Sequence, residues 1–207
     1  MHILLTDRLT CPRCGPGFGL ILLAKRLAER RVLDGALGCP NCRDYFPIQG
    51  GFADLRPPPR DLLTATPPAA DPGAEATNRL AALLGVLEGP GTVALLGSVA
   101  VHAAALADRL PEIEVVAVDA ATHAEVERER VSRLVTGVEL PFQPWTFRAL
   151  ATVGDVVAPE EAVRVVGHGG RVAMERPGPD ATAQFERAGS RILLQEGGWV
   201  VALRETR

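Results

Sequence analysis

The chain has 207 residues, of which 47% are hydrophobic and only 4% are aromatic, so we expect a core built mainly from Ala, Val and Leu. Its formal net charge of −3 gives no general attraction to nucleic acid or to an anionic membrane. No apolar run approaches the length that spans a bilayer, and residues 1–5 are too short for a signal peptide, so a cytoplasmic protein is expected.

All four cysteines form two Cys-x-x-Cys pairs, Cys11 with Cys14 and Cys39 with Cys42. Four thiolates in two close pairs can complete a tetrahedral shell around zinc, because each two-residue spacer lets a turn aim both sulfurs at one point. Two disulfides fit less well without a sign of an oxidising compartment, and a redox motif needs only one pair. The spacing therefore predicts a structural zinc ion with no open position for catalysis.

Residues 1–56 are predicted to form a zinc ribbon, a small β module that relies on its metal. Short strands are expected at 18–24, 32–37, 45–48 and 52–55, with a charged turn or short helix at 25–31. Residues 57–78 contain a run of three prolines and a run of two, and this density of proline predicts a linker.

The remaining block, 79–207, alternates helices with apolar strands, and its first helix is expected to begin already at residue 74. Helices are predicted at 74–88, 102–110, 122–134, 159–166 and 181–188. Strands are predicted at 92–96, 114–118, 149–153 and 170–175, and a closing hairpin at 191–194 and 199–203. The fold class is therefore α/β: the ribbon, then a Rossmann-like, mainly parallel sheet with an antiparallel hairpin at its edge.

Three motifs follow one another in the first block: LTCPRC at 9–14, GCPNC at 38–42 and YFPIQGG at 45–51. With them, the block resembles the small zinc-binding activator subunit of tRNA and protein methyltransferases. In that family the module binds and stabilises a methyltransferase through an exposed apolar β-edge. The resemblance implies a protein partner for this chain, either a methyltransferase or another assembly.

Three further phrases lie in the last block: Val118-Asp119 at a strand end, LPF at 140–142 followed by Phe147, and EAVRVV at 161–166 leading to GGRV at 169–172. Taken in this order, they resemble the class I methyltransferases that bind S-adenosylmethionine. The resemblance implies that Gly97, in the turn after the first strand, and Asp119, whose carboxylate would bind the ribose hydroxyls, contact this cofactor. The alternative role for Asp119 is to cap the following helix.

The turn at 97–101 departs from the glycine-rich pattern of that family, because only Gly97 matches and Val99 and Val101 stand at the other two glycine positions. Branched side chains resist positive φ and would bring methyl groups into the space of the cofactor. This argues against S-adenosylmethionine as a cofactor, and no catalytic residue is assigned. Trp145, in a proline-rich loop, either lines a pocket mouth or covers the edge of the core.

These observations predict a zinc-binding, methyltransferase-like protein that lacks catalysis and acts as a scaffold or regulatory subunit for a protein partner. Two alternatives stay open. One is an active S-adenosylmethionine-dependent methyltransferase with an atypical cofactor turn. The other is an RNA-binding zinc-ribbon protein, against which the acidic balance of the chain argues.

Overall fold

The computed structural model describes residues 1–63, 71–154 and 156–205. Its α-helices are α1 (Ile3–Thr6), α2 (Ala74–Leu84), α3 (Ala103–Arg109), α4 (Pro159–Val165) and α5 (Ala181–Arg187), with 3-10 helices η1 (Gly97–His102) and η2 (Ala120–Ala124). The strands of the first block are β1 (Thr10–Cys11), β2 (Gly15–Gly19), β3 (Ile21–Ala28), β4 (Arg31–Gly38), β5 (Tyr45–Gln49) and β6 (Phe52–Leu55). The later strands are β7 (Gly91–Leu96), β8 (Ile113–Val118), β9 (Val131–Thr136), β10 (Phe147–Val153), β11 (Val166–Glu175), β12 (Ser190–Glu196) and β13 (Trp199–Arg204).

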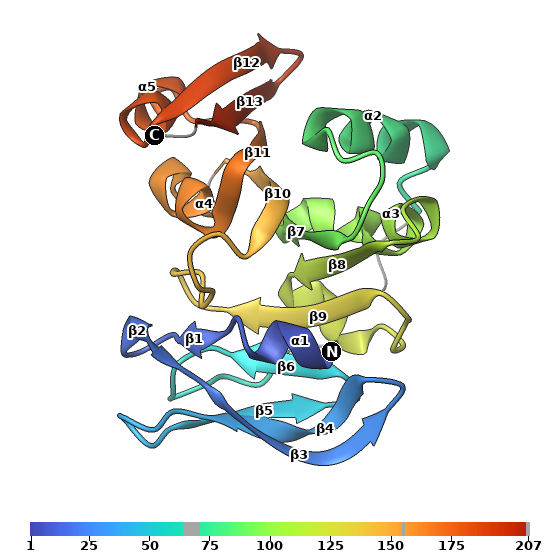
Figure 1. Ribbon diagram of the computed structural model, residues 1–207, viewed down its shortest axis with the longest axis vertical. Helices are drawn as coiled ribbons and strands as arrows, with labels where there is room; N and C mark the ends of the chain where they lie inside the picture. Colours follow the sequence, from blue (N-terminus) through green and yellow to red (C-terminus); the bar gives the residue numbers. More distant parts are fainter. Residues whose placement is uncertain (64–70, 155, 206–207) are drawn as a thin grey trace.

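One 11-stranded sheet runs through the protein in the order β12-β13-β11-β10-β7-β8-β9-β6-β5-β4-β3, and Figure 1 shows it as a continuous stack. The six central strands, from β11 to β6 in this order, run parallel to one another. Antiparallel strands extend the sheet at both ends: the β12–β13 hairpin beside β11, and β5, β4 and β3 beside β6. The mixed α/β class, the mainly parallel sheet and the closing hairpin are therefore confirmed.

Strand β6 of the first block joins the parallel sheet through β9, with Phe52 opposite Arg133 and Leu55 opposite Thr136. The prediction of a helix at 122–134 is wrong. Only η2 is helical there, and β9 begins at Val131. The charged side chain of Arg133 and the hydroxyl of Ser132 hid this strand, since both are buried within an otherwise apolar segment.

The expected turn or short helix at 25–31 is also not seen, because β3 continues to Ala28 and β4 starts at Arg31. Glu29 and Arg30 make the tight turn between them with positive φ at both residues, which matches the twist of a hairpin. The other predicted helices and strands are present within a few residues of their expected bounds, although the strand expected at 18–24 is divided between β2 and β3.

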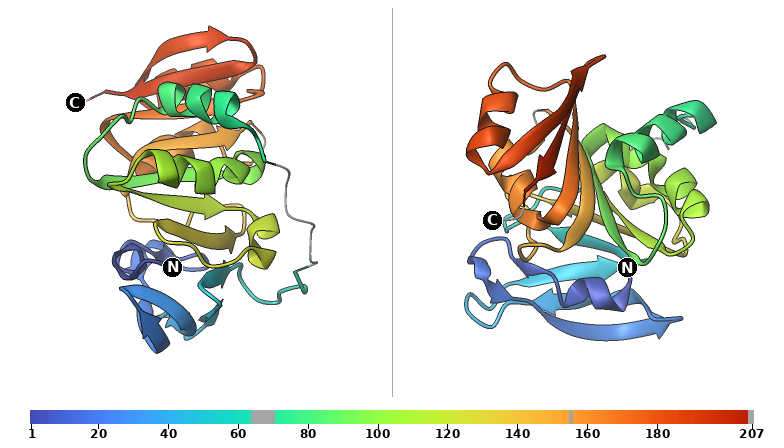
Figure 2. Two further views of the ribbon diagram at one scale, coloured as in Figure 1. Left: turned by 90° about the vertical axis from the view of Figure 1, so that its right-hand side faces the viewer. Right: turned by 45° about the horizontal axis from the view of Figure 1, so that its top comes forward.

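Helices cover the sheet on both faces: α2 and α3 on one side, α4 and α5 on the other (Figures 1 and 2). The apolar core beneath α4 and α5 is shared by the two blocks. It contains Leu37 and Phe46 of the ribbon strands together with Leu134, Phe142 and Phe185 of the larger part. Helix α2 begins inside the range assigned to the linker, and part of that range lies outside the described residues. The division at 56 and 79 stays a prediction.

Among the described helices, none is both long enough and apolar enough to cross a membrane.

Candidate metal centre and cofactor site

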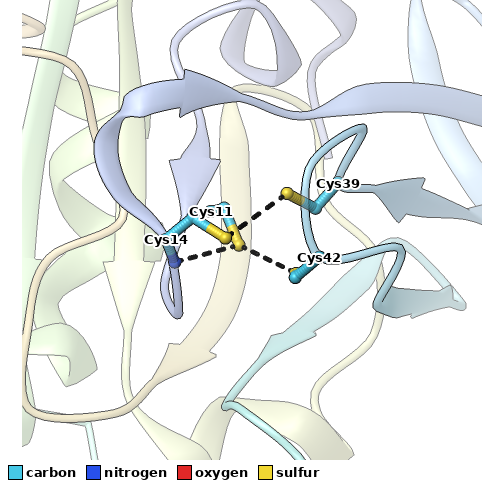
Figure 3. Close-up of side chains that lie close together, drawn as sticks. All are labelled: Cys11, Cys14, Cys39 and Cys42. Atoms are coloured by element: carbon cyan, nitrogen blue, oxygen red, sulfur yellow. Dashed lines mark hydrogen bonds between the residues drawn. The ribbon is translucent and has the colours of Figure 1, made fainter.

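The four cysteines come together at one end of the ribbon, as Figure 3 shows. Cys11 ends β1 and Cys14 follows in the turn to β2, while Cys39 and Cys42 lie in the turn from β4 to β5. All four sulfur atoms lie within 4.8 Å of one another. The Sγ atoms of Cys11 and Cys42 are 3.7 Å apart, and those of Cys39 and Cys14 are 3.9 Å apart.

These distances fit a metal centre. Zn–S bonds of about 2.3 Å place the sulfurs of a tetrahedron about 3.8 Å apart, whereas a disulfide needs about 2.05 Å. The cysteines are free thiols, so the sequence pattern and the geometry agree on a metal-binding cluster. Cys11 and Cys39 are buried and the other two are partly exposed, so the cluster lies at the edge of the core.

Hydrogen bonds around the sulfurs orient the cluster. The backbone N–H of Cys14 donates to the Cys11 sulfur at 3.4 Å, and the Asn41 amide donates to the Cys14 sulfur at 3.3 Å. Burial alone would raise the pKa of the Cys39 thiol. The backbone N–H groups of Cys42 and Asn41, with the neighbouring thiols, outweigh burial and lower this pKa to about 7. Donors of this kind stabilise the thiolates that a metal requires.

A second candidate site lies at the carboxyl ends of the parallel strands. A hollow of about 200 Å³ is lined by Gly97 after β7, Asp119 after β8, residues at the end of β9, and Val156. Carboxyl ends of parallel strands are where α/β sheets of this type hold their ligands. Gly97 and Asp119, which lie far apart in the sequence, are therefore brought together as the family resemblance implies. The hollow is smaller than the roughly 300–1,000 Å³ that encloses a ligand of cofactor size.

Val156 lies over Gly97. A Cβ atom at Gly97 would meet Val156 Cγ2 at 2.8 Å, so the space that this glycine leaves is already filled from the loop after β10. The prediction that Val99 and Val101 occupy the cofactor space is wrong. Val99 is buried in the core under α2 and α3, and neither valine lines the hollow. Sequence inspection missed Val156 because it follows a different strand.

Asp119 acts as the cap of η2. Its Oδ1 accepts a hydrogen bond of 2.8 Å from the backbone N–H of Ala121, and the Thr122 hydroxyl donates to its backbone carbonyl at 2.8 Å. The capping role left open by the sequence is thus the one that the side chain has here. Gly97 has a φ of +72°, which a glycine adopts without strain at the turn from β7 into η1.

Sequence analysis also missed a buried charged cluster where β9 meets the ribbon. Arg133, only 1% exposed, donates to the carbonyl oxygens of Gly50 and Thr122 at 2.8 and 2.9 Å and to that of Glu125. It also contacts the Glu127 carboxylate at 3.3 Å. Glu127 in turn accepts a hydrogen bond from Arg31 of β4. The cluster therefore ties the turn before β6 and the start of β4 to the larger sheet.

Trp145 is 59% exposed and has a φ of +62°, a rare conformation for a bulky residue. It lines the edge of a large cleft at the amino ends of the parallel strands, at the opposite edge of the sheet from Gly97, so of its two expected roles the structure favours the pocket mouth.

No protein-family model and no curated protein sequence matches this chain. Its fold is similar to a solved chain from a complex between the Haloferax volcanii Trm112 methyltransferase activator and a candidate methyltransferase. The two are 15% identical, with a TM-score of 0.51 over 63% of this chain and 90% of that one.

Two other solved structures are similar at lower scores. The antibiotic-resistance methyltransferase Kmr is 16% identical with a TM-score of 0.46, and the match covers 63% of this chain and 93% of that chain. The precorrin-6y C5,15-methyltransferase from Geobacter metallireducens is 12% identical with a TM-score of 0.47, over 68% and 94%. At these identities the likeness shows the fold alone: the chain has a class I methyltransferase-like, Rossmann-type sheet and a cysteine cluster able to bind a metal ion.

Proposed function

We propose that this chain is a zinc-binding, methyltransferase-like protein that acts by binding a protein partner and does not transfer methyl groups. The observation that carries the proposal is the side chain of Val156, which fills the space over Gly97 and leaves a hollow of only about 200 Å³. An adenosyl cofactor needs that space for its methionine and ribose parts, which must approach the glycine backbone closely.

Zinc is the metal that the cluster suits best. Four thiolates at the spacing of a tetrahedron satisfy its preferred geometry, and a full shell leaves no position for water or substrate. The ion would hold the two turns of the ribbon together, and the ion pair between Arg13 and Asp44, at 3.0 Å, links the same two turns.

A protein partner is supported by the ribbon's outer face. On β4, Gly38 pairs with Ile21 of β3 on one side and with Tyr45 of β5 on the other, so these three residues lie side by side across the sheet. Leu23 lies two residues after Ile21 along β3 and therefore on the same face. The side chains of Ile21, Leu23 and Tyr45 are 55%, 47% and 61% exposed. The similar complex of an activator with a candidate methyltransferase makes a methyltransferase the first partner to test. The β6 edge is not free for this purpose, because β9 already pairs with it.

Isothermal titration calorimetry with S-adenosylmethionine tests the proposal that this protein does not bind the cofactor. We expect no measurable binding by the wild type, and a gain of binding in Val156→Gly because this change opens the space over Gly97. The matched control is Val138→Gly, at a valine that is 90% exposed and does not line the hollow. Micromolar binding by the wild type would overturn the proposal. If Val156→Gly also fails to bind, Val156 is not the obstacle and the proposal loses its main support.

Quantitative affinity capture tests the partner. A protein bound through the outer face of the ribbon should be enriched with the wild type and with Leu62→Glu, an exposed site elsewhere, but lost with Leu23→Glu. Equal enrichment by all three proteins would contradict this surface.

The second candidate function is an active methyltransferase with an atypical cofactor turn. It is favoured by the positive φ of Gly97 and by the position of Asp119 beside it in the hollow. S-adenosylhomocysteine carried through purification, detected by mass spectrometry, would select this function over the first.

A further inference from the structure

A cleft of about 1100 Å³ opens at the amino ends of the parallel strands, at the opposite edge of the sheet from Gly97 and Asp119. Its lining comes from the first residues of β7, β8, β10 and β11, from α1 and from the turn before β4. Its volume is slightly above the range of roughly 300–1,000 Å³ that encloses small ligands, so it has room for one. The proposed function makes no use of it.

The half of the cleft beside β10 and β11 is cationic. Its charged lining residues are Arg8, Arg148 and Arg171, and among the described lining residues of this half there is no carboxylate; the neutral ring of His168 lies beside them. The other half, near β8 and the turns before β4 and β9, carries charges of both signs: Glu29, Glu112, Glu114 and Glu129 with Arg30, Arg31 and Arg130. An anion is therefore attracted to one half of the cleft, although the chain as a whole is acidic.

Two of these arginines are held in place without losing their charge. Arg148 donates to the carbonyl oxygens of the turn at 88–90 at 3.0–3.1 Å, and Arg171 donates to that of Ala82 at 3.5 Å. Carbonyls are neutral, and no carboxylate within the described ranges is close enough to either guanidinium for an ion pair. Both side chains lie flat over glycines, since a Cβ at Gly91 or Gly85 would overlap Arg148 or Arg171. Arg148 is thus held by three hydrogen bonds and Arg171 mainly by its packing against Gly85, and guanidinium groups without a carboxylate partner suit phosphate oxygens.

Arg8 adds an adaptable cation. It is exposed, and its guanidinium has no hydrogen-bond or ion-pair partner among residues 1–63, 71–154 and 156–205. Its backbone carbonyl accepts a hydrogen bond of 2.8 Å from Gln143, two residues before Trp145. The chain carrying Arg8 is therefore fixed beside the loop that carries Trp145.

Trp145 supplies a flat aromatic surface at the same half of the cleft. Its ring centroid lies 5.7 Å from that of His168, and the Arg204 guanidinium lies 5.8 Å from the indole centroid. More than half of the side chain is still exposed, and its backbone keeps a strained positive φ to hold it there. An exposed indole next to several cations is the arrangement on which a nucleic-acid base stacks while its phosphate is bound.

We infer that the β10–β11 half of this cleft binds a nucleotide unit, with the base stacked on Trp145 and the phosphate held by Arg148, Arg171 and Arg8. A free nucleotide and a single-stranded RNA present the same unit. A phosphotyrosine peptide shares the phosphate and a ring, but its smaller ring makes less use of the indole surface, so the nucleotide is the better fit.

The experiment uses the full chain and three probes: AMP by calorimetry, and a fluorescein-labelled 12-nucleotide oligoadenylate and a labelled phosphotyrosine peptide by anisotropy. Saturable binding of AMP alone identifies the free nucleotide as the ligand, and much tighter binding of the oligonucleotide identifies the RNA strand; either result supports the inference. The inference is overturned if neither nucleotide probe binds. It is also overturned if the phosphotyrosine peptide binds more tightly than both nucleotide probes.

Variants separate the stacking from the charge. Trp145→Asn, which tolerates the positive φ, should weaken binding about 5- to 150-fold, the range expected for one stacked base, and Trp145→Tyr should restore most of it. Arg8→Gln should weaken binding and lower the slope of log K against log salt by about 1. Arg109→Gln, an exposed arginine of α3 outside the cleft, removes the same charge and should change neither quantity. Equal effects of the Arg8 and Arg109 changes would show that the attraction is general and not a site.

Discussion

The buried guanidinium of Arg133 gives the sharpest test of how the ribbon is attached to the larger sheet. We consider Arg133→Met, which keeps the length of the side chain but removes its donors. The carbonyl oxygens of Glu125 and Gly50 lose their donor, and they have no other among the described hydrogen bonds. A buried acceptor without a partner costs about 1–3 kcal/mol, but Glu125 is only partly buried and Gly50 is exposed, so water replaces part of what each carbonyl loses and the two together cost about 2–3 kcal/mol.

Two features reduce this cost. The variant no longer buries a charge, and Glu127 keeps its hydrogen bond to Arg31. We therefore expect the free energy of unfolding to fall by about 2 kcal/mol. With an m value of about 2 kcal/mol/M, the midpoint of urea unfolding should fall by about 1 M.

Arg128→Met is the matched control, because Arg128 pairs with Asp108 at 2.6 Å on the surface, where the two side chains are 47% and 60% exposed. Exposed pairs of this kind contribute about 0–1 kcal/mol. Equal urea midpoints for the two variants would refute the reasoning, because the attachment would then depend on strand pairing and apolar contacts alone.

Three further predictions concern the ribbon and its junction. Cys42→Ser should lower the amount of bound zinc from about one ion per chain toward none, measured by mass spectrometry of the metal after dialysis. The reason is that one ligand of four is lost from a site whose binding free energy is typically about 10–16 kcal/mol. Retention of one zinc ion per chain would contradict the proposed site. Gly35→Ala should destabilise the protein by about 1–3 kcal/mol in urea unfolding, because its Cβ would lie 2.5 Å from the Leu23 carbonyl oxygen, whereas Gly17→Ala, with nothing within 4 Å, should be nearly neutral. Burial alone would raise the pKa of Glu127, but the hydrogen bond from Arg31 and nearby positive charges hold it below its usual value. A carboxyl with a lowered pKa stabilises the fold above its unfolded pKa of about 4.5 and loses this effect as the pH falls through its folded pKa. The gap in unfolding free energy between wild type and Glu127→Gln should therefore be largest near pH 7 and shrink below about pH 4, and a gap that does not change with pH would contradict this assignment.

The sequence predicted the parts of the fold that rest on local patterns. The cysteine spacing predicted a cluster that the sulfur positions confirm, and the uniformly apolar strands β7 and β8 were found at their expected places. Strand β9 was missed because its pattern includes Arg133, whose burial depends on carbonyl groups contributed by distant segments. Local propensity contains no information about such partners.

The hollow beside Gly97 shows the same limit. The sequence suggested an obstruction within the glycine turn itself, at Val99 and Val101. The turn forms a 3-10 helix that directs Val99 into the core, and the side chain that fills the space over Gly97 is Val156 on the neighbouring loop. Which side chain fills a space between two strands depends on sheet order, and this is a tertiary property.

The pairing of β6 with β9 has a consequence for biosynthesis. Phe52 and Arg133, which lie opposite each other, are 133 − 52 = 81 positions apart. At about 5–20 residues per second, a ribosome needs roughly 4–16 s to make the second strand after the first. During those seconds one side of β6 has no neighbour, and an unpaired strand edge readily recruits other extended chains. The newly made ribbon is therefore most exposed to wrong association before the rest of its own sheet arrives.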